Sequence, residues 1–415
     1  MADLTSFAPA LKTIYEDKLL AIATMQTRPL LGLLPKYEQF GGDYLPLPVK
    51  YSNQQMRSHT FATAQGTSLN SAWVKFLLTR TENHSLAHVS SHVAAASGDS
   101  RKAYLKALKT EIDSAFDALA DSLETELFRS KDGVLGQVGT SGITTTTLTL
   151  SDVNDVSNFE VNMELCASAT ATGSLIDSGN TATVTGINRV DGELTTDSNW
   201  TSQISGLTDA YYLFQQGDAA DGGTELALSG LASWGPSSAP SASESFFGVD
   251  RSVSSRLYFV IYDGSSEMIE EALIGGQSTA AQLHEGQIDT FIINNAQYRK
   301  LAKQLGAKKE YSEVNAQGGK GMYANISYRG FKVQGDHGEI TVVAANKCQS
   351  TIGWGIEKQN VCLYSLGPAM RFDDTDGQTI LRRASASGVE ARTVSWSQLG
   401  IKSPGHNVRI TFAAA

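Results

Sequence analysis

Apolar residues recur every three or four positions across residues 99–129, which is the spacing of one face of an α-helix. This face consists of Leu105, Leu108, Ile112, Phe116, Leu119, Leu123 and Leu127. Asp99 can cap the first turn with its carboxylate, and Gly133 lies where such a helix would end. At 1.5 Å per residue the helix would be about 45 Å long. The pattern therefore predicts one helix as long as a domain, which we call the spine helix.

Alternating apolar and polar positions before the spine helix predict a long hairpin. Residues 44–51 alternate but contain Pro46 and Pro48, which have no backbone N–H to donate, so this strand belongs at a sheet edge or in a two-stranded ribbon. Residues 72–79 predict the returning strand. Because isolated two-stranded ribbons are marginally stable in water, we expect another surface to hold this one.

Composition changes after the spine helix, where residues 143–218 become rich in Thr, Ser and Val. Short alternating runs predict strands at 144–150, 162–167, 182–188, 193–196 and 211–214. Asp191-Gly192 predicts a two-residue hairpin turn. The segment is interpreted as an inserted small β-barrel or sandwich, followed by a linker at 230–245 that is rich in Ser, Pro and Ala.

The remaining segments predict mixed structure. An arm at 1–35 contains one short helix near 11–25, and the second half of the chain combines helices and strands. Its predicted elements are a strand at 257–262, helices at 267–274 and 296–305, and further strands at 290–293, 361–366, 379–383, 389–397 and 407–412. Residues 373–377 form an acidic turn between two of these strands.

Charge and cysteine content exclude several classes of protein. The 415 residues include 33 basic and 43 acidic side chains, a net charge of −10, without a Lys/Arg-rich run, which disfavours tight binding of nucleic-acid phosphates. Three cysteines without a C-x-x-C pair argue against a disulfide framework and a zinc site. No apolar run is long enough to predict a membrane span.

Candidate chemistry is sparse. His84, His88 and His92 are spaced by four, which could align metal ligands, but a polar face is the favoured interpretation. The acidic turn does not match a calcium loop, because Phe372 takes the first ligand position and Arg383 replaces the bidentate glutamate. Glycine-rich stretches lack phosphate-loop spacing, and no catalytic signature occurs. We therefore expect no enzyme activity and no catalytic, cofactor-binding or metal-binding residues.

The order of the predicted elements resembles that of the Hong Kong 97-like major capsid proteins of tailed bacteriophages. The resemblance is carried by residues 72–97 running into the helix, by Ser245-Phe246-Phe247-Gly248-Val249-Asp250-Arg251, by 291–305 before Gly306, and by Leu363-Tyr364-Ser365-Leu366-Gly367. It implies an α+β capsid fold with the inserted β unit added.

The resemblance also implies a division of the chain. The implied parts are an N-terminal arm (1–35), an extended loop (36–84), a peripheral domain with the spine helix (85–142), the inserted β domain (143–229), the linker (230–245), an axial domain (246–361), peripheral strands with the acidic turn (362–398), and a C-terminal segment packed on the axial domain (399–415).

By this resemblance the expected function is that of a major capsid protein, which self-assembles into hexamers and pentamers of an icosahedral shell around double-stranded DNA. The implied partners are other copies of the chain, a separate scaffolding protein, a portal protein, a decoration protein, and DNA held without sequence-specific contact. Assembly in the host cytoplasm and a place in the virion capsid follow. A receptor-binding or glycan-binding virion surface protein of the fibre or decoration type is the alternative, motivated by the Thr/Ser-rich β segment.

Two charge patterns predict contacts between subunits. Basic residues open the spine helix and acidic residues follow, which opposes the helix dipole. The first hypothesis is that Asp117 and Asp121 receive the basic extended loop of a neighbouring copy, through Lys50, Arg57, Lys75 and Arg80. The alternative is that the charges merely keep the outer face hydrated. A second hypothesis pairs the acidic turn (Asp373, Asp374 and Asp376) with Arg382 or Arg383 of neighbours.

Overall fold

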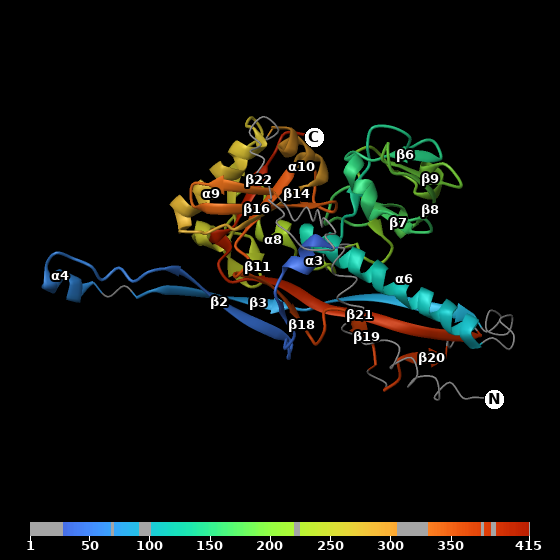
Figure 1. Ribbon diagram of the computed structural model, residues 1–415, viewed down its shortest axis with the longest axis horizontal. Coiled ribbons are helices and arrows are strands. Elements are labelled where there is room, and N and C mark those ends of the chain that lie inside the picture. The colour runs from blue at the N-terminus through green and yellow to red at the C-terminus, as the bar shows by residue number, and fades with distance from the viewer. Residues whose placement is uncertain are drawn as a thin grey trace, which may run out of the picture.

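The computed structural model describes residues 28–67, 70–90, 101–219, 225–304, 331–374, 377–382 and 387–414; for 101–107 and Phe331 it describes the backbone. Figure 1 shows an elongated molecule, with a two-stranded ribbon leaving one end of the body and a long helix lying towards the other end. Within the described residues the body contains three six-stranded sheets. The predicted helix near 11–25 lies outside the described residues.

The first sheet carries the spine helix. It has the order β1 (Lys36–Tyr37), β18 (Val361–Ser365), β21 (Gly388–Ile401) and β19 (Arg371–Phe372), with β4 (Thr81–Ser90) and β20 (Ile380–Arg382) also paired to β21. Helix α6 (Arg101–Phe128) packs on β4 and β21, in agreement with the helix predicted over 99–129. The six described residues of its apolar face, Leu108 to Leu127, are all buried. Phe116 meets Phe372 of β19 edge-on, with ring centroids 5.1 Å apart.

The second sheet forms a separate unit, which we call the axial unit after the axial domain expected at 246–361. Its strand order is β13 (Val260–Asp263), β22 (Val408–Thr411), β17 (Ile352–Ile356), β14 (Thr290–Asn294), β16 (Gly338–Ala345) and β15 (Phe331–Gly335), and α9 (Ile269–His284) and α10 (Asn295–Gln304) pack on it. The C-terminal segment thus lies inside this sheet: β22 pairs with β13 on one side and β17 on the other. Helix α9 continues to His284, whereas the sequence predicted an end at residue 274.

The third sheet is the β unit. Its order is β5 (Gly136–Gln137), β10 (Tyr212–Gln215), β7 (Glu164–Ser168), β8 (Ala182–Asn188), β9 (Glu193–Thr196) and β6 (Thr147–Thr149). A bridge between Val138 and Leu150 joins the two edges, so the sheet closes into a small barrel around its own buried cluster. Since β5 belongs to this sheet, the unit begins before the predicted boundary at 143. The β8–β9 connection spans residues 189–192, and of the expected two turn residues only Gly192 has positive φ.

The segment 230–245, predicted as a linker, instead contributes to the core. It contains α8 (Leu231–Trp234), in which Leu231 and Trp234 are fully buried. The Trp234 ring lies 5.1 Å from Phe76 and 5.0 Å from Phe246, centroid to centroid, and its Nε1 donates to the Leu399 carbonyl at 3.3 Å. The prediction of a linker was wrong because it relied on the Ser, Pro and Ala content of the segment. It did not consider the large aromatic side chain of Trp234.

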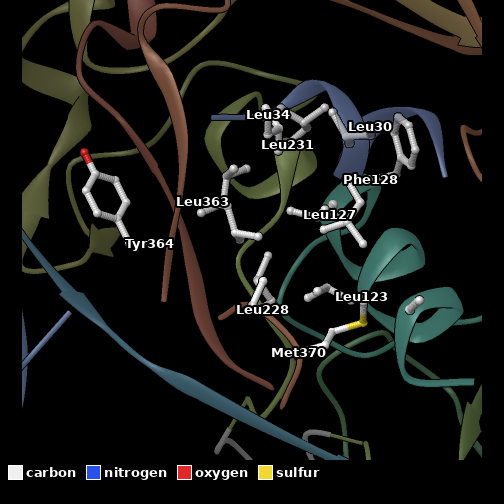
Figure 2. Packing of buried hydrophobic residues seen from close by; sticks show 14 of the residues in the cluster. Leu30, Leu34, Leu123, Leu127, Phe128, Leu228, Leu231, Leu363, Tyr364 and Met370 are labelled. Carbon is white, nitrogen blue, oxygen red and sulfur yellow. The ribbon is translucent and has the colours of Figure 1, made fainter. Parts of the chain in front are cut away.

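The largest core cluster joins parts that are far apart in the sequence. Figure 2 shows Leu30 and Leu34 beside Leu127 and Phe128 of α6, with Leu231 and Leu363 completing the group. The arm segment around α3 (Pro29–Leu33) is therefore packed on the spine helix.

Short elements complete the part of the chain that the structure describes. They are α4 (Phe61–Gly66), α7 (Trp200–Gln203), β11 (Ser245–Phe246), β12 (Val249–Asp250), and the 3-10 turns η2 (Val153–Asn158), η3 (Ile176–Gly179), η4 (Arg251–Val253), η5 (Ser255–Leu257) and η7 (Pro404–His406).

Candidate functional site

A two-stranded ribbon leaves the body of the molecule (Figure 1). It consists of β2 (Tyr44–Ser52) and β3 (Ala72–Thr79), which pair with each other in a separate two-stranded sheet, with α4 in the loop that joins them (Figure 1). Pro46 and Pro48 are tolerated because β2 has a ladder partner on one side. The sequence-based prediction of a ribbon is therefore confirmed.

The two faces of the ribbon have different surroundings. Because side chains alternate along a strand, one face carries Leu47, Val49, Phe76 and Leu78, which are buried against the core. The opposite face carries Tyr44, Trp73 and Leu77, which are 56%, 59% and 39% exposed. Phe61 in α4 is 81% exposed. The ribbon is thus anchored by one face and presents large apolar side chains to solvent on the other.

The predicted basic residues of the ribbon divide into two groups. Lys50 and Lys75 lie on the exposed face together with Trp73, and Arg57 is exposed in the segment before α4. Arg80 differs, because its Nη1 donates to the Phe40 carbonyl at 3.2 Å and its guanidinium lies 5.4 Å from the centre of the Phe40 ring. Three of the four are therefore placed to meet another surface.

Two acidic residues of the spine helix, Asp117 and Asp121, form ion pairs with Arg28 of the same chain. Arg28 reaches both Asp117 and Asp121, with N to O distances of 3.3 and 3.0 Å. Next to this pair, Glu124 accepts hydrogen bonds from the backbone N–H groups of Leu30 and Leu31. Sequence reasoning missed this contact because Arg28 is an isolated basic residue far from the helix in the chain. Asp117 remains exposed, so the predicted contact with a neighbour's loop stays a prediction.

Glu126 is a half-buried carboxylate on the side of α6 that faces β4. Glu126 accepts hydrogen bonds from Asn83 Nδ2, Ser122 Oγ and the Leu228 N–H, and burial raises its pKa to about 7. Glu126 borders a cavity of about 640 Å³, and the exposed Asp218 borders the same cavity. Glu126 thus ties α6 to β4 through Asn83 and to the chain after the β unit through Leu228.

The acidic turn is only partly described. Asp374 is exposed and Asp373 is half-buried, with its backbone N–H donating to the Arg392 carbonyl at 2.9 Å. Arg382 is exposed at the end of β20. Asp376 and Arg383 lie outside the described residues, so the predicted pairing of this turn with neighbours stays a prediction.

The histidine pattern does not converge on a metal site in the described part. His84 and His88 are exposed on β4, and His92 lies outside the described residues. Among described residues, no group of three or more His, Cys, Asp or Glu side chains could hold a metal ion. Likewise, no described helix is long and apolar enough to cross a membrane.

Comparison with known proteins identifies the fold. No protein-family model matches the sequence, and no curated protein matches it. Among solved structures, the chain is similar to one titled as the capsid asymmetric unit of cyanophage A-1(L), with a TM-score of 0.51, 11% identity, and 92% of each chain covered. The chain thus has the α+β fold of the Hong Kong 97-like capsid proteins, as its sequence predicts.

Two further structures extend over similar lengths. The capsid of Myoviridae phage XM1 has a TM-score of 0.45 at 9% identity, covering 92% of this chain and 90% of that one. The capsid of a native GTA particle has a TM-score of 0.44 at 8% identity, with the same two coverages. None of these comparisons supports the alternative of a fibre-type or decoration-type surface protein.

Proposed function

We propose that this chain is a major capsid protein whose copies assemble as hexamers and pentamers into a closed icosahedral shell around double-stranded DNA. The observation that carries the proposal is the outer face of the ribbon, where Tyr44, Trp73 and Leu77 are solvent-exposed in the single chain. Large apolar side chains grouped in this way are typical of a contact surface.

A second copy of the chain is the partner that best fits this face. The ribbon face is apolar and basic, through Lys50 and Lys75, whereas the exposed side of α6 is acidic at Asp117 and Asp121. A contact between two different surfaces of the same protein repeats from copy to copy, and it generates closed rings when the rotation closes. Rings of this kind are the capsomers of a shell.

The remaining partners belong to the same proposal. A separate scaffolding protein would direct closure in the host cytoplasm, a portal protein would occupy one vertex of the virion capsid, and a decoration protein would bind outside. The net charge of −10 suits a wall that encloses DNA without retaining it, because a basic lining would bind phosphates strongly. The mechanism is geometric and needs no catalytic group.

Co-expression with the genes that neighbour it tests the proposal directly. Sedimentation and negative-stain microscopy of the purified product should show closed shells. A compact monomer whose ribbon resists proteolysis would contradict the capsid function itself.

Two variants test the role of the ribbon separately. Trp73→Ser with Leu77→Ser should leave the body folded, because both side chains are exposed, but should stop assembly at free subunits or capsomers. Val190→Ser is the matched control, since Val190 is an exposed apolar residue of the β unit. Normal shells from the double variant would show that the exposed face of the ribbon does not form the assembly contact. They would not contradict the capsid function.

A further inference from the structure

A polar cavity lies where the ribbon meets the axial unit. Its volume is about 220 Å³, and it is bordered by β2, η5, the C-terminal end of α9 and the segment around η7. The side chains that give it its chemistry are Lys50, Arg256, His284, Glu285, Ser403 and His406. These come from four separate parts of the chain, so the fold brings them together.

Two basic side chains border this cavity without a carboxylate partner among the described residues. Arg256 is half-buried, and its Nη1 donates to the Tyr51 carbonyl at a long 3.5 Å. Lys50 is exposed at the edge of the cavity. Within the part of the chain that the structure describes, neither forms an ion pair. A guanidinium and an ammonium that face one cavity create a positive potential there.

His284 supplies an independent sign of a ligand. Its side chain is buried at the end of α9, and neither Nδ1 nor Nε2 has a hydrogen-bond partner among the described residues. A buried polar group without a partner is costly, and native proteins rarely keep one without reason. Burial, followed by the nearby charges of Arg256 and His406, holds the pKa of His284 below its usual value. A negatively charged ligand beside the ring would therefore supply the missing hydrogen-bond partner and offset the nearby positive charges.

The cavity is not balanced by its own acids. Glu285 is the carboxylate that borders it, and this exposed residue can turn towards solvent. Glu357 lies close by but is engaged by His406, whose Nδ1 is 2.8 Å from its Oε2. Arg256 and Lys50 therefore outnumber Glu285, the one carboxylate that borders the cavity among the described residues.

Gly405 packs closely against His284 and the Arg256 backbone at the border of the cavity. A Cβ at Gly405 would lie 3.1 Å from His284 Cδ2 and 2.9 Å from the Arg256 Cα, which is too close for any other residue without movement. The backbone of η7 can therefore approach both side chains. This close approach places the Ser403 segment and His406 at the same cavity as Arg256.

We propose that this cavity binds a small tetrahedral oxyanion of the phosphate class. Arg256 and Lys50 provide the charge, His284 donates one N–H to the anion, and the Ser403 hydroxyl completes the donor set. Charge-assisted hydrogen bonds of this kind are stronger than neutral ones. The bound anion would join β2 to η5, α9 and η7, and it would fix the base of the ribbon to the body. This role goes beyond the proposed capsid function and holds for a single chain.

Titration calorimetry of the full chain with sodium phosphate tests the proposal. Ionic strength is kept constant with sodium chloride, and acetate serves as a second probe, to separate a tetrahedral oxyanion from any carboxylate. We expect saturable binding of phosphate with one site per chain. Absence of saturable binding, or equal affinity for acetate, would overturn the assignment to the phosphate class.

Two substitutions test the residues. Arg256→Gln should weaken phosphate binding at least about tenfold, the size expected on losing one charge-assisted contact. Lys50→Gln should weaken it several-fold and is safe for folding, because Lys50 is exposed. Lys75→Gln is the matched control: it lies on the same face of the ribbon but does not border the cavity. Equal affinities for the Lys50 and Lys75 variants would contradict the proposal.

A spectroscopic measurement on the unaltered protein covers the case in which a variant fails to fold. In a sample with isotope-labelled histidine, the ring signal of His284, assigned by its loss in His284→Asn, should shift on addition of phosphate. The signals of His84 and His88, which are exposed on β4, should stay unchanged. An unmoved His284 signal at saturating phosphate would show that the ring does not contact the anion.

Discussion

The carboxylate of Glu124 accepts a hydrogen bond from the backbone N–H of Leu31 at 2.8 Å, and this contact fastens the arm to the spine helix. Its second oxygen accepts from the Leu30 N–H at 3.0 Å. Glu124 is 1% exposed, and burial raises its pKa to about 7 despite these two hydrogen bonds. Because the pKa of Glu124 is near 7 in the folded chain, the stability of the fold around this contact depends on pH.

We expect the folded state to be destabilised as pH rises through 7. In the folded chain the pKa of Glu124 is about 7, above its ordinary value of 4.5, so the folded chain binds the proton more tightly than the unfolded chain does. This contribution is fully present below about pH 4.5 and is lost as pH rises through 7. The shift corresponds to about 3 kcal/mol at most. Hydrogen exchange over residues 28–34, corrected for the intrinsic rate, should show protection falling roughly 10-fold to 100-fold between these limits.

The variant Glu124→Gln checks the cause of this pH dependence. A neutral amide cannot titrate, so the exchange protection of residues 28–34 should become independent of pH over the same range. Glu111→Gln is the matched control, because Glu111 is exposed on the same helix. Protection that rises with pH in the unaltered protein would show that the charged form is the one that docks.

Reversal of Asp117 and Asp121 to lysine should impair shell formation, but two mechanisms could cause this. The substitutions remove the contact with a neighbouring loop, and they also repel Arg28 of the same chain. Arg28→Gln separates the two, because it loses the internal contact and leaves both carboxylates available. If the neighbour contact matters, Arg28→Gln forms shells in microscopy and Asp117→Lys with Asp121→Lys does not. Normal shells from Asp117→Lys with Asp121→Lys would contradict the predicted contact with a neighbouring loop.

Much of the fold could be predicted from periodicity. Steps of three and four placed the end of the spine helix to within one residue, because an apolar face with this period fits a helix and does not fit a strand. The predicted start at residue 99 and the predicted cap Asp99 lie outside the described residues. Prolines in β2 identified a strand that pairs on one side. The end of α9 was missed, because Gly275 and Gly276 interrupt the pattern although the helix continues; a Cβ on Gly276 would lie 2.8 Å from Ile410 Cδ1, so glycine is needed for packing.

The candidate site was less predictable. Charge along the sequence identified Lys50 and Asp117, but it could not show that Arg28 already occupies the acidic side of α6. Such a contact depends on how the arm folds back over a large separation in the chain. The cluster of Arg256, His284 and His406 was missed for the same reason, since its members lie in three segments without a shared motif.

Truncation of Trp234 tests whether 230–245 belongs to the core. Trp234→Ala should destabilise the protein by about 3–5 kcal/mol, the usual cost of deleting a fully buried large aromatic side chain. Trp73→Ala is the matched control, because Trp73 is 59% exposed and its loss leaves no cavity. The midpoints of urea denaturation compare the two. A similar small shift for both variants would mean that the segment behaves as a linker in solution.

If the acidic turn pairs with neighbouring copies, we expect assembly to be sensitive to salt. Asp374 and Arg382 are both exposed, so an ion pair that they form between neighbours would be weak, about 0 to 1 kcal/mol, and would be screened within about 8 Å at physiological ionic strength. A closed shell repeats each contact many times, so we expect light scattering to show slower assembly as salt rises.

Asp374→Arg should impair assembly at low salt, and adding Arg382→Asp should restore it, because the exchanged charges attract again. Lys332→Gln is the control, since Lys332 pairs with Glu339 of its own chain at 2.9 Å and should leave the salt dependence unchanged. Assembly that is insensitive to salt, or a double exchange that fails to restore it, would exclude the pairing.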